Sequence, residues 1–411
     1  MLTHECKGNA SYKHLSIKQE NIDLYYKNKP RIFATVPKYL TIIILAFLSV
    51  QCCEKNIQGN EKRITIDLEE RTETSVFDLT DSITVVPLHT SDSCLIATIN
   101  QIEKKKDTLY IYDMLQSAFF CFKTNGSYLF KISDKGNGPE EYQHIEHFSV
   151  SETGEIFLLE PWGNIYQYSN KGVFKQKIKL PHVLESYNEI YVRGNSIIII
   201  SVSGDILYYS LSDGTYQCFH LYERMNAFFP IKRTSIYNDS IMNVSLFDNQ
   251  IYKITQEGLI PSWSWDFKDN NNSEQNIKKL TSRITYNPND KSVLTDYVGK
   301  GKPLKQFIYT SCESNRFKIA LMEYNNSFLH VFHDKTNHKN WVFKRTKENT
   351  IFHTCTYTDN TFIYYDQPFT RGWRNLTCIT EEILGEKYNV YTNLKNDSDS
   401  NPTVILFHLK E

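Results

Sequence analysis

The stretches Phe122–Ile132 (FKTNGSYLFKI) and Tyr168–Ile178 (YSNKGVFKQKI) read as two copies of one β-hairpin. In each copy, residues typical of strands flank a short turn, which is TNG at 124–126 and NKG at 170–172. Asn and Gly in these turns supply the positive φ that a tight hairpin requires. The recurrence of one hairpin within a chain indicates a fold built from copies of a single unit.

Each hairpin lies inside a longer unit of four predicted strands separated by turn residues. The predicted strands are 96–104, 108–113, 118–123 and 128–133 in the first unit, and 145–151, 155–160, 164–169 and 173–180 in the second. Further units are predicted at 187–221, 234–267 and 307–344, followed by two strands and a helix-like segment at 379–388. The period is close to the ~40 to 45 residues of a four-stranded propeller blade. The sequence therefore predicts an all-β fold, a six-bladed β-propeller, with an insertion at about 268–306.

Two β-rich runs at the ends of the repeat region belong to no complete unit, Ile83–Leu88 and Val404–Leu409. If both pair onto the sixth unit, the N- and C-terminal strands close the ring in the last blade and hide its edges. A pair of β-sandwiches is the alternative, and the forty-residue repetition disfavours it. We therefore expect one propeller over residues 76–411.

The composition agrees with strands and excludes some functions. Of 411 residues, 27 are Tyr and 24 are Phe, a usage that suits half-buried strands. The net charge of -1 offers no basic field for a phosphate backbone, so nucleic acid is not an expected partner. Nine cysteines show no metal-ligand or disulfide spacing, and no nucleotide-binding motif occurs, so no cofactor or metal is expected.

An apolar run near the N-terminus, Leu40–Val50, indicates an export signal. Its 11 residues are fewer than the ~20 of a spanning helix and match the roughly 7 to 15 of a signal-peptide core. A cysteine directly after such a core is where a lipoprotein is cut and acylated. Cys53 is the preferred attachment residue over Cys52, because Cys52 would follow Gln51 where a small residue is wanted. A plain secretory signal or an uncleaved anchor stays open as the alternative.

The segments around this signal complete the predicted organisation. Residues 1–35 are polar and lysine-rich, and we expect them to be a mis-assigned or disordered extension before the signal at 36–53. Residues 54–75 are predicted to form a tether. The expected partner is thus a membrane, and the expected location is the cell envelope. There the lipid would hold the protein at the outer membrane, on its periplasmic side or at the cell surface.

The loop Ser133–Tyr142 (SDKGNGPEEY) resembles the Gly-x-Gly-Pro-Gly-Glu-Tyr loop of six-bladed β-propeller lipoproteins of Bacteroidota, within the TolB-like and NHL-like propellers. The matching residues are Gly136, Gly138, Pro139, Glu141 and Tyr142, and Glu140 replaces the usual glycine. The segments 247–254 with 265–267 resemble the family's fourth blade, and Asn401-Pro402 before VILFHLK resembles its closing strand. The resemblance implies the fold and a lipid anchor. It implies almost nothing about the ligand.

Five residues of predicted loops are candidates for binding a ligand: Glu141, Tyr142, His144, Trp162 and Trp373. Aromatic rings on turns can stack on a sugar or a peptide, although propeller aromatics more often pack between blades. Glu141 can alternatively cap neighbouring backbone N–H groups. The predicted function is a binding or scaffolding module for a glycan, a peptide or an envelope protein.

An enzyme, either a lyase or a glycoside hydrolase, is the alternative. The pairs His144/His147 and His330/His333 each place two histidines three residues apart. On a strand such positions point to opposite faces, so neither pair can chelate one metal without a bulge. The resemblance to a zinc-dependent propeller lyase leaves His144, His147 and His353 as a more distant candidate set.

Acidic residues around the second unit could supply the two carboxylates of glycoside hydrolysis: Glu140, Glu141, Glu146, Glu152 and Glu160. The sequence does not set their separation, and a solvated loop explains them as well. An enzyme predicts that carboxylates, histidines or a metal converge within ~10 Å at the channel.

Overall fold

A computed structural model describes residues 62–201, 204–220, 234–238, 240–244, 249–279, 299–366, 379–395 and 399–411. These residues all belong to one folded unit. The predicted extension 1–35, the predicted signal at 36–53 with Cys52 and Cys53, and the candidate Trp373 lie outside the described residues.

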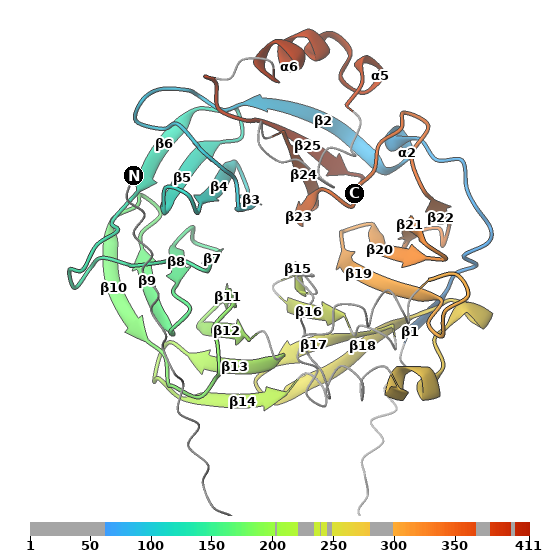
Figure 1. The fold of residues 1–411 in the computed structure, drawn as a ribbon, viewed down its shortest axis with the longest axis horizontal. Coiled ribbons are helices and arrows are strands. Elements are labelled where there is room, and N and C mark those ends of the chain that lie inside the picture. Colours follow the sequence, from blue (N-terminus) through green and yellow to red (C-terminus); the bar gives the residue numbers. More distant parts are fainter. Residues whose placement is uncertain are drawn as a thin grey trace, which may run out of the picture. The chain divides into compact units, whose positions relative to one another are not determined.

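Six β-sheets stand around a central axis, and we refer to each sheet as a blade (Figure 1). Blade one holds β3 (Gln101–Lys105), β4 (Thr108–Asp113), β5 (Ala118–Lys123) and β6 (Tyr128–Ile132). Blade two holds β7 (His147–Val150), β8 (Ile156–Leu159), β9 (Asn164–Tyr168) and β10 (Phe174–Lys179). Blade three holds β11 (Glu189–Arg193), β12 (Ser196–Ile200), β13 (Asp205–Ser210) and β14 (Tyr216–His220). In each blade the strands follow one another antiparallel, and the first strand lies nearest the axis.

The next two blades repeat this order. Blade four holds β15 (Thr234–Tyr237), β16 (Ser240–Val244), β17 (Gln250–Thr255) and β18 (Gly258–Asp266). Blade five holds β19 (Gln306–Glu313), β20 (Phe317–Tyr324), β21 (Ser327–Asp334) and β22 (Asn340–Phe343). Between them, the described parts of the predicted insertion are residues 268–279, with η1 (Lys268–Asn270) and helical residues 274–279, and residues 299–306. The six-bladed propeller predicted from the repeat is therefore confirmed.

Blade six is assembled from three separate parts of the chain. Its strands, from the axis outward, are β23 (Thr356–Thr358), β24 (Thr361–Tyr365), β25 (Thr403–Leu409) and β2 (Thr80–Pro87). In the antiparallel pair β2 and β25, Val86 lies opposite Val404. The prediction that both terminal strands complete the last blade is confirmed. The short helices α5 (Glu381–Leu384), η3 (Gly385–Lys387) and α6 (Tyr388–Lys395) follow β24.

Blade four carries a fifth strand that the sequence analysis missed. Strand β1 (Lys62–Thr65) pairs parallel with β18, with Ile64 opposite Trp265. Ile64, Ile66 and Leu68 are all buried, so this segment contributes to the core. The tether predicted for residues 54–75 is therefore wrong from Lys62 onward, because the alternating apolar side chains bury themselves against blade four. The helix α2 (Val76–Leu79) follows, begun by a capping box at Ser75.

The hydrophobic core lies mainly between neighbouring blades. Phe119 of blade one meets Phe148 of blade two edge to face, with ring centroids 4.8 Å apart. Both rings are fully buried. An aromatic pair of this geometry contributes about 0.5 to 1.5 kcal/mol beyond its buried area. Aromatic side chains thus pack neighbouring blades against each other.

Among the described residues, no helix is long and apolar enough to cross a membrane.

Candidate functional site

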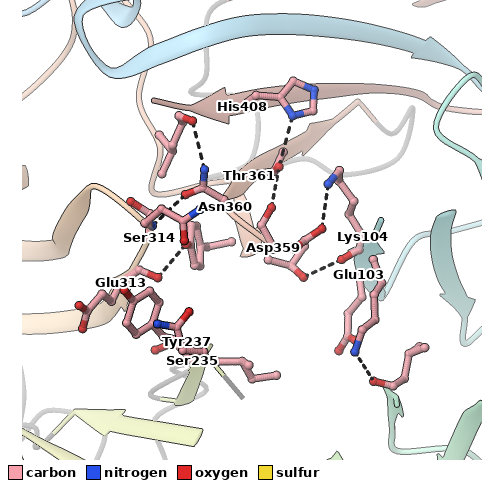
Figure 2. A pocket seen from close by; sticks show the side chains of 18 of the residues that line it. Glu103, Lys104, Ser235, Tyr237, Glu313, Ser314, Asp359, Asn360, Thr361 and His408 are labelled. Carbon is pink, nitrogen blue, oxygen red and sulfur yellow. Dashed lines mark hydrogen bonds and ion pairs between the residues drawn. The ribbon is translucent and has the colours of Figure 1, made fainter. Parts of the chain in front are cut away.

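A polar cavity of about 550 Å³ opens at one end of the central axis, and we refer to it as the channel mouth (Figure 2). The inner strands β3, β7, β11, β15, β19 and β23 all contribute to it, and each does so with its C-terminal residue. Its charged residues are Asp81, Glu103, Lys104, Lys105, Glu152, Arg193, Glu313, Asp359 and Glu411. Six blades therefore place charged and polar side chains around one hollow.

One side of the channel mouth holds two cations with a shared carboxylate. Lys105 Nζ lies 2.5 Å from Glu152 Oε1, and Arg193 Nε lies 3.9 Å from the same oxygen. The Lys105 and Arg193 side chains are only 17% and 12% exposed, whereas the Glu152 side chain is 49% exposed. Burial lowers the pKa of Lys105, with the charge of Arg193 acting in the same direction and Glu152 opposing both. This side of the mouth is therefore basic and poorly solvated.

The other side presents carboxylates from blades five and six. Asp359 Oδ2 is 3.0 Å from Lys104 Nζ, and its side chain is half exposed. Glu313 lies 3.0 Å from Lys335 Nζ and 3.7 Å from Lys318 Nζ. Figure 2 shows Glu313, at the end of β19, and Asp359, in the turn after β23, at the opening. The mouth is thus polarised, with a basic side at blades one to three and an acidic side at blades five and six.

On the acidic side, a buried lysine, Lys318, lies behind Glu313. Its ammonium lies 3.7 Å from the centroid of the Trp263 ring, a cation–π contact. Burial lowers the pKa of Lys318 to about 8, and the charge of Glu313 opposes the shift. Lys318 fixes the position of Glu313 and does not itself line the cavity.

Neutral and aromatic groups fill the wall between the charged sides. Tyr237 is half-buried, and its hydroxyl accepts a hydrogen bond of 2.8 Å from Lys335 Nζ. The hydroxyl of Tyr357 donates to the carbonyl oxygen of Glu313 at 2.8 Å. Small polar side chains complete the lining: Thr234, Ser235, Asn238, Ser314, Asn315, Thr358, Asn360 and Thr361. Such a surface offers many hydrogen bonds to an uncharged polar ligand.

The four binding candidates that belong to the described residues lie at the other end of the axis. Glu141, Tyr142 and His144 precede β7, and Trp162 lies in the turn between β8 and β9, whereas the mouth lies where β7 ends. Neighbouring strands in a blade run in opposite directions. The loop before β7 and the turn between β8 and β9 therefore lie at the same end of the blade, opposite the mouth. Trp162 is 61% exposed there and stays a candidate for contact.

Two of these candidates have structural partners. Tyr142 is fully buried, and its hydroxyl donates to the carbonyl oxygen of Ser117 at 2.7 Å, so it presents no surface to a ligand. Glu141 Oε2 accepts a hydrogen bond of 2.8 Å from the Gly138 N–H. A Cβ at Gly136 would meet that same carboxylate oxygen, so a side chain there would displace the Glu141 carboxylate. The motif residues therefore shape a capped loop, the second of the two roles considered for Glu141.

The histidines and glutamates considered for catalysis do not form one cluster. Among the described residues, no three His, Cys, Asp or Glu side chains are grouped so that they could hold a metal ion, so His144, His147 and His353 do not come together as a site. His353 instead contacts His330, with Nδ1 and Nε2 3.0 Å apart. Glu160 is buried and accepts from the Gln143 N–H.

Of the residues of the channel mouth, Glu152 was among the acidic candidates, and the others were missed because the lining is shared among six blades. The available signal was a charged residue at or near the end of the first strand of several units, namely Glu103 to Lys105, Arg193 and Glu313. In one unit such a residue is an ordinary strand end. Only the ring closure places all of them around one axis.

The fold and the mouth define the class: a six-bladed β-propeller with a polar, charge-paired cavity at one end of its channel. The sequence profile of the family described as "Domain of unknown function (DUF4934)" matches residues 62–408, so the chain belongs to this family. This confirms the resemblance to a propeller family of unknown function. No curated protein matches the sequence significantly.

Solved structures agree with the fold. A crystal structure described as a "Putative exported protein" from Bacteroides fragilis NCTC 9343 superposes with a TM-score of 0.61 at 16% identity, covering 85% of this chain and 100% of that one. A member of the DUF4221 family from Bacteroides vulgatus reaches 0.45 at 10% identity, covering 80% and 99%. Virginiamycin B lyase from Staphylococcus aureus reaches 0.35 at 14% identity, covering 64% and 74%. At 16% identity, the first structure shows a similar fold and nothing more. The TM-scores of the other two are too low to support any conclusion about this chain.

Proposed function

We propose that this protein is a binding module of the cell envelope and that its ligand site is the channel mouth. The observation that carries the proposal is the cavity of about 550 Å³ lined from all six blades. Its volume lies within the ~300 to 1,000 Å³ of small-ligand sites. Rigid strands hold its side chains, and they pair charges with hydrogen-bonding groups. This construction suits recognition of a glycan, a peptide end or a loop of a partner protein.

We also propose that the module is exported and held at the outer membrane by a lipid on Cys53, or on Cys52. The support is the apolar run Leu40–Val50 directly before these cysteines. The description of the Bacteroides fragilis structure as a "Putative exported protein" supports the export step of this proposal. Mass spectrometry of the natural protein should find an acylated N-terminal cysteine. Recovery of a Cys52→Ser/Cys53→Ser variant still in the membrane fraction would contradict the anchor.

The binding site can be tested by filling the cavity. Asn315 is exposed at the mouth, so Asn315→Trp adds bulk there without removing a buried group. Lys179→Trp adds the same bulk on the exposed outer strand of blade two and is the matched control. Glycan and peptide arrays should show wild-type hits that the control keeps and Asn315→Trp loses. Hits that survive Asn315→Trp unchanged would place the site elsewhere.

A further inference from the structure

We infer that the channel mouth binds an acidic saccharide, with the sugar carboxylate between Lys105 and Arg193 in place of Glu152. This inference rests on the proposed function and names the ligand class for the same site. It follows from the charges on the basic side, from the exposure of Glu152 and from the neutral groups on the remaining wall.

The first step is the unequal burial of the charges on the basic side. Two cations that are more than four-fifths buried, Lys105 and Arg193, share Glu152, which is half exposed. Poorly solvated cations repel each other strongly, because little water screens them. Glu103 also lines this side, where its charge acts on Lys105 and its carboxylate accepts a hydrogen bond from Gln101 at 3.0 Å. The carboxylate that both cations share is Glu152, and this is the place that a ligand anion would take.

The second step is the geometry at Arg193. One guanidinium nitrogen donates to the Val192 carbonyl oxygen at 2.6 Å. Arg193 Nε is buried, has no hydrogen-bond partner, and lies 3.9 Å from Glu152 Oε1, beyond hydrogen-bonding distance. A carboxylate seated slightly deeper than Glu152 can accept from Arg193 Nε and from Lys105 Nζ together. Glu152 can turn outward, since half of its side chain already faces solvent.

The third step is the wall beyond the cations. Ser235, Asn238 and Asn360 offer neutral donors and acceptors of the kind that pair with hydroxyl groups. Asp359, half exposed on the acidic side, can accept from sugar hydroxyls. The half-buried Tyr237 supplies a ring against which a sugar can pack. A uronic acid combines one carboxylate with several hydroxyl groups and so matches both sides of the mouth.

The test is calorimetric titration of the full-length protein with a galacturonic acid trimer and with the neutral galactose trimer. We expect the acidic trimer to bind about tenfold or more tightly, since hydrogen bonds to charged groups are strong. Arg193→Met should weaken that binding about tenfold or more. Glu152→Gln should strengthen it, because it removes the competing internal carboxylate. A merely structural role for Glu152 predicts the reverse.

The controls separate the possible outcomes. Lys175→Met removes an exposed lysine that is ion-paired with Glu155 on the outside of blade two, and it should leave the affinity unchanged. If Arg193→Met does not fold by circular dichroism, Glu152→Gln alone decides. Equal binding of the neutral trimer, or full competition by acetate at matched ionic strength, overturns the inference. If only peptides or neutral glycans bind, and Asn315→Trp abolishes their binding, the inference is overturned and the proposed function stands. If ligands bind Asn315→Trp as well as the wild type, both are overturned.

Discussion

Blade two and blade six have the same four antiparallel strands but are built from the chain in opposite ways. Blade two is continuous from His147 to Lys179, so hairpin turns join each strand to the next. Blade six takes its inner strands from residues 356–365, its third strand from 403–409 and its outer strand from 80–87. Figure 1 shows the blue β2 beside the red β25 at the point where the ring closes. One blade depends on local contacts and the other on the closed ring.

This difference shows where the stability of the ring is concentrated. Pairing strands that are distant in the sequence costs loop-closure entropy, so such contacts form only when the rest of the fold supports them. A change that opens blade six should release the early strand β2 and the C-terminal strand β25 at once. The same change in blade two should leave the rest of the ring closed.

The largest effect should follow from a charge in the outer strand of blade six. Val86 on β2 is fully buried opposite Val404. Val86→Asp buries an unpaired carboxylate in the closure, and we expect it to cost more than ~4 kcal/mol. Ile178→Asp on β10 changes the equivalent strand of blade two, where the side chain is only half-buried, and should cost clearly less. Urea unfolding followed by tryptophan fluorescence measures both; equal losses would mean that closure is not the weak point.

A smaller effect should follow from changing Asn401, whose side chain links the segment before β25 to the segment after β2. Its side-chain oxygen accepts from the Ile96 N–H at 2.7 Å, and its amide donates to the carbonyl oxygens of His89 at 2.7 Å and Cys94 at 2.9 Å. Asn401→Ala removes the partner of the buried Ile96 N–H and Cys94 carbonyl and should cost about 2 to 4 kcal/mol in unfolding free energy.

The matched variant for this prediction is Asn164→Ala in blade two. Asn164 makes one local side-chain hydrogen bond, to Glu160 Oε2 at 2.8 Å, and we expect a loss of about 1 kcal/mol. Chemical denaturation of the two variants side by side measures the difference. A smaller loss for Asn401→Ala than for Asn164→Ala would show that Asn401 does not hold the ends together.

The smallest effect depends on pH and lies at the joint between blades five and six. His330 Nε2 accepts from the Phe352 N–H at 2.8 Å and lies 3.0 Å from His353 Nδ1. Burial lowers the pKa of His330 well below 6.5 and that of His353 to about 4. Both are therefore neutral when folded, and the unfolded chain binds more protons below pH 6.5. Their contribution to stability is complete above pH 6.5 and is lost as the pH falls toward 4.

This pH dependence can be isolated with His353→Phe, which keeps a ring beside Phe328 and removes one titrating group. Between pH 6.5 and 4, the variant should lose about 1 to 3 kcal/mol less unfolding free energy than the wild type. Thermal unfolding across that range measures it. The exposed His182, changed to Gln, is the control and should follow the wild type. Parallel curves for His353→Phe and the wild type would contradict the assignment.

The sequence predicted the fold more fully than the site. Hairpins such as 122–132 were readable because their turns and alternating side chains are local signals. Strand β1 was missed because Lys62–Thr65 is a run of only four residues next to polar residues, which in the sequence resembles a linker. Only the structure shows that it pairs with Trp263 and Trp265 of β18. The loop 133–142 was recognised as a motif, yet its Tyr142 proved to be buried.

By itself, the sequence determined the repeat, the number of blades and the closure by both terminal strands, since these follow from periodicity and from strands left unpaired. Only the tertiary structure decided which polar residues face one another. Lys105, Glu152 and Arg193 belong to three blades, and they meet because the ring brings inner strands from different blades to one axis. Spacing along the chain contains no information about that meeting, because it depends on the rotation from blade to blade.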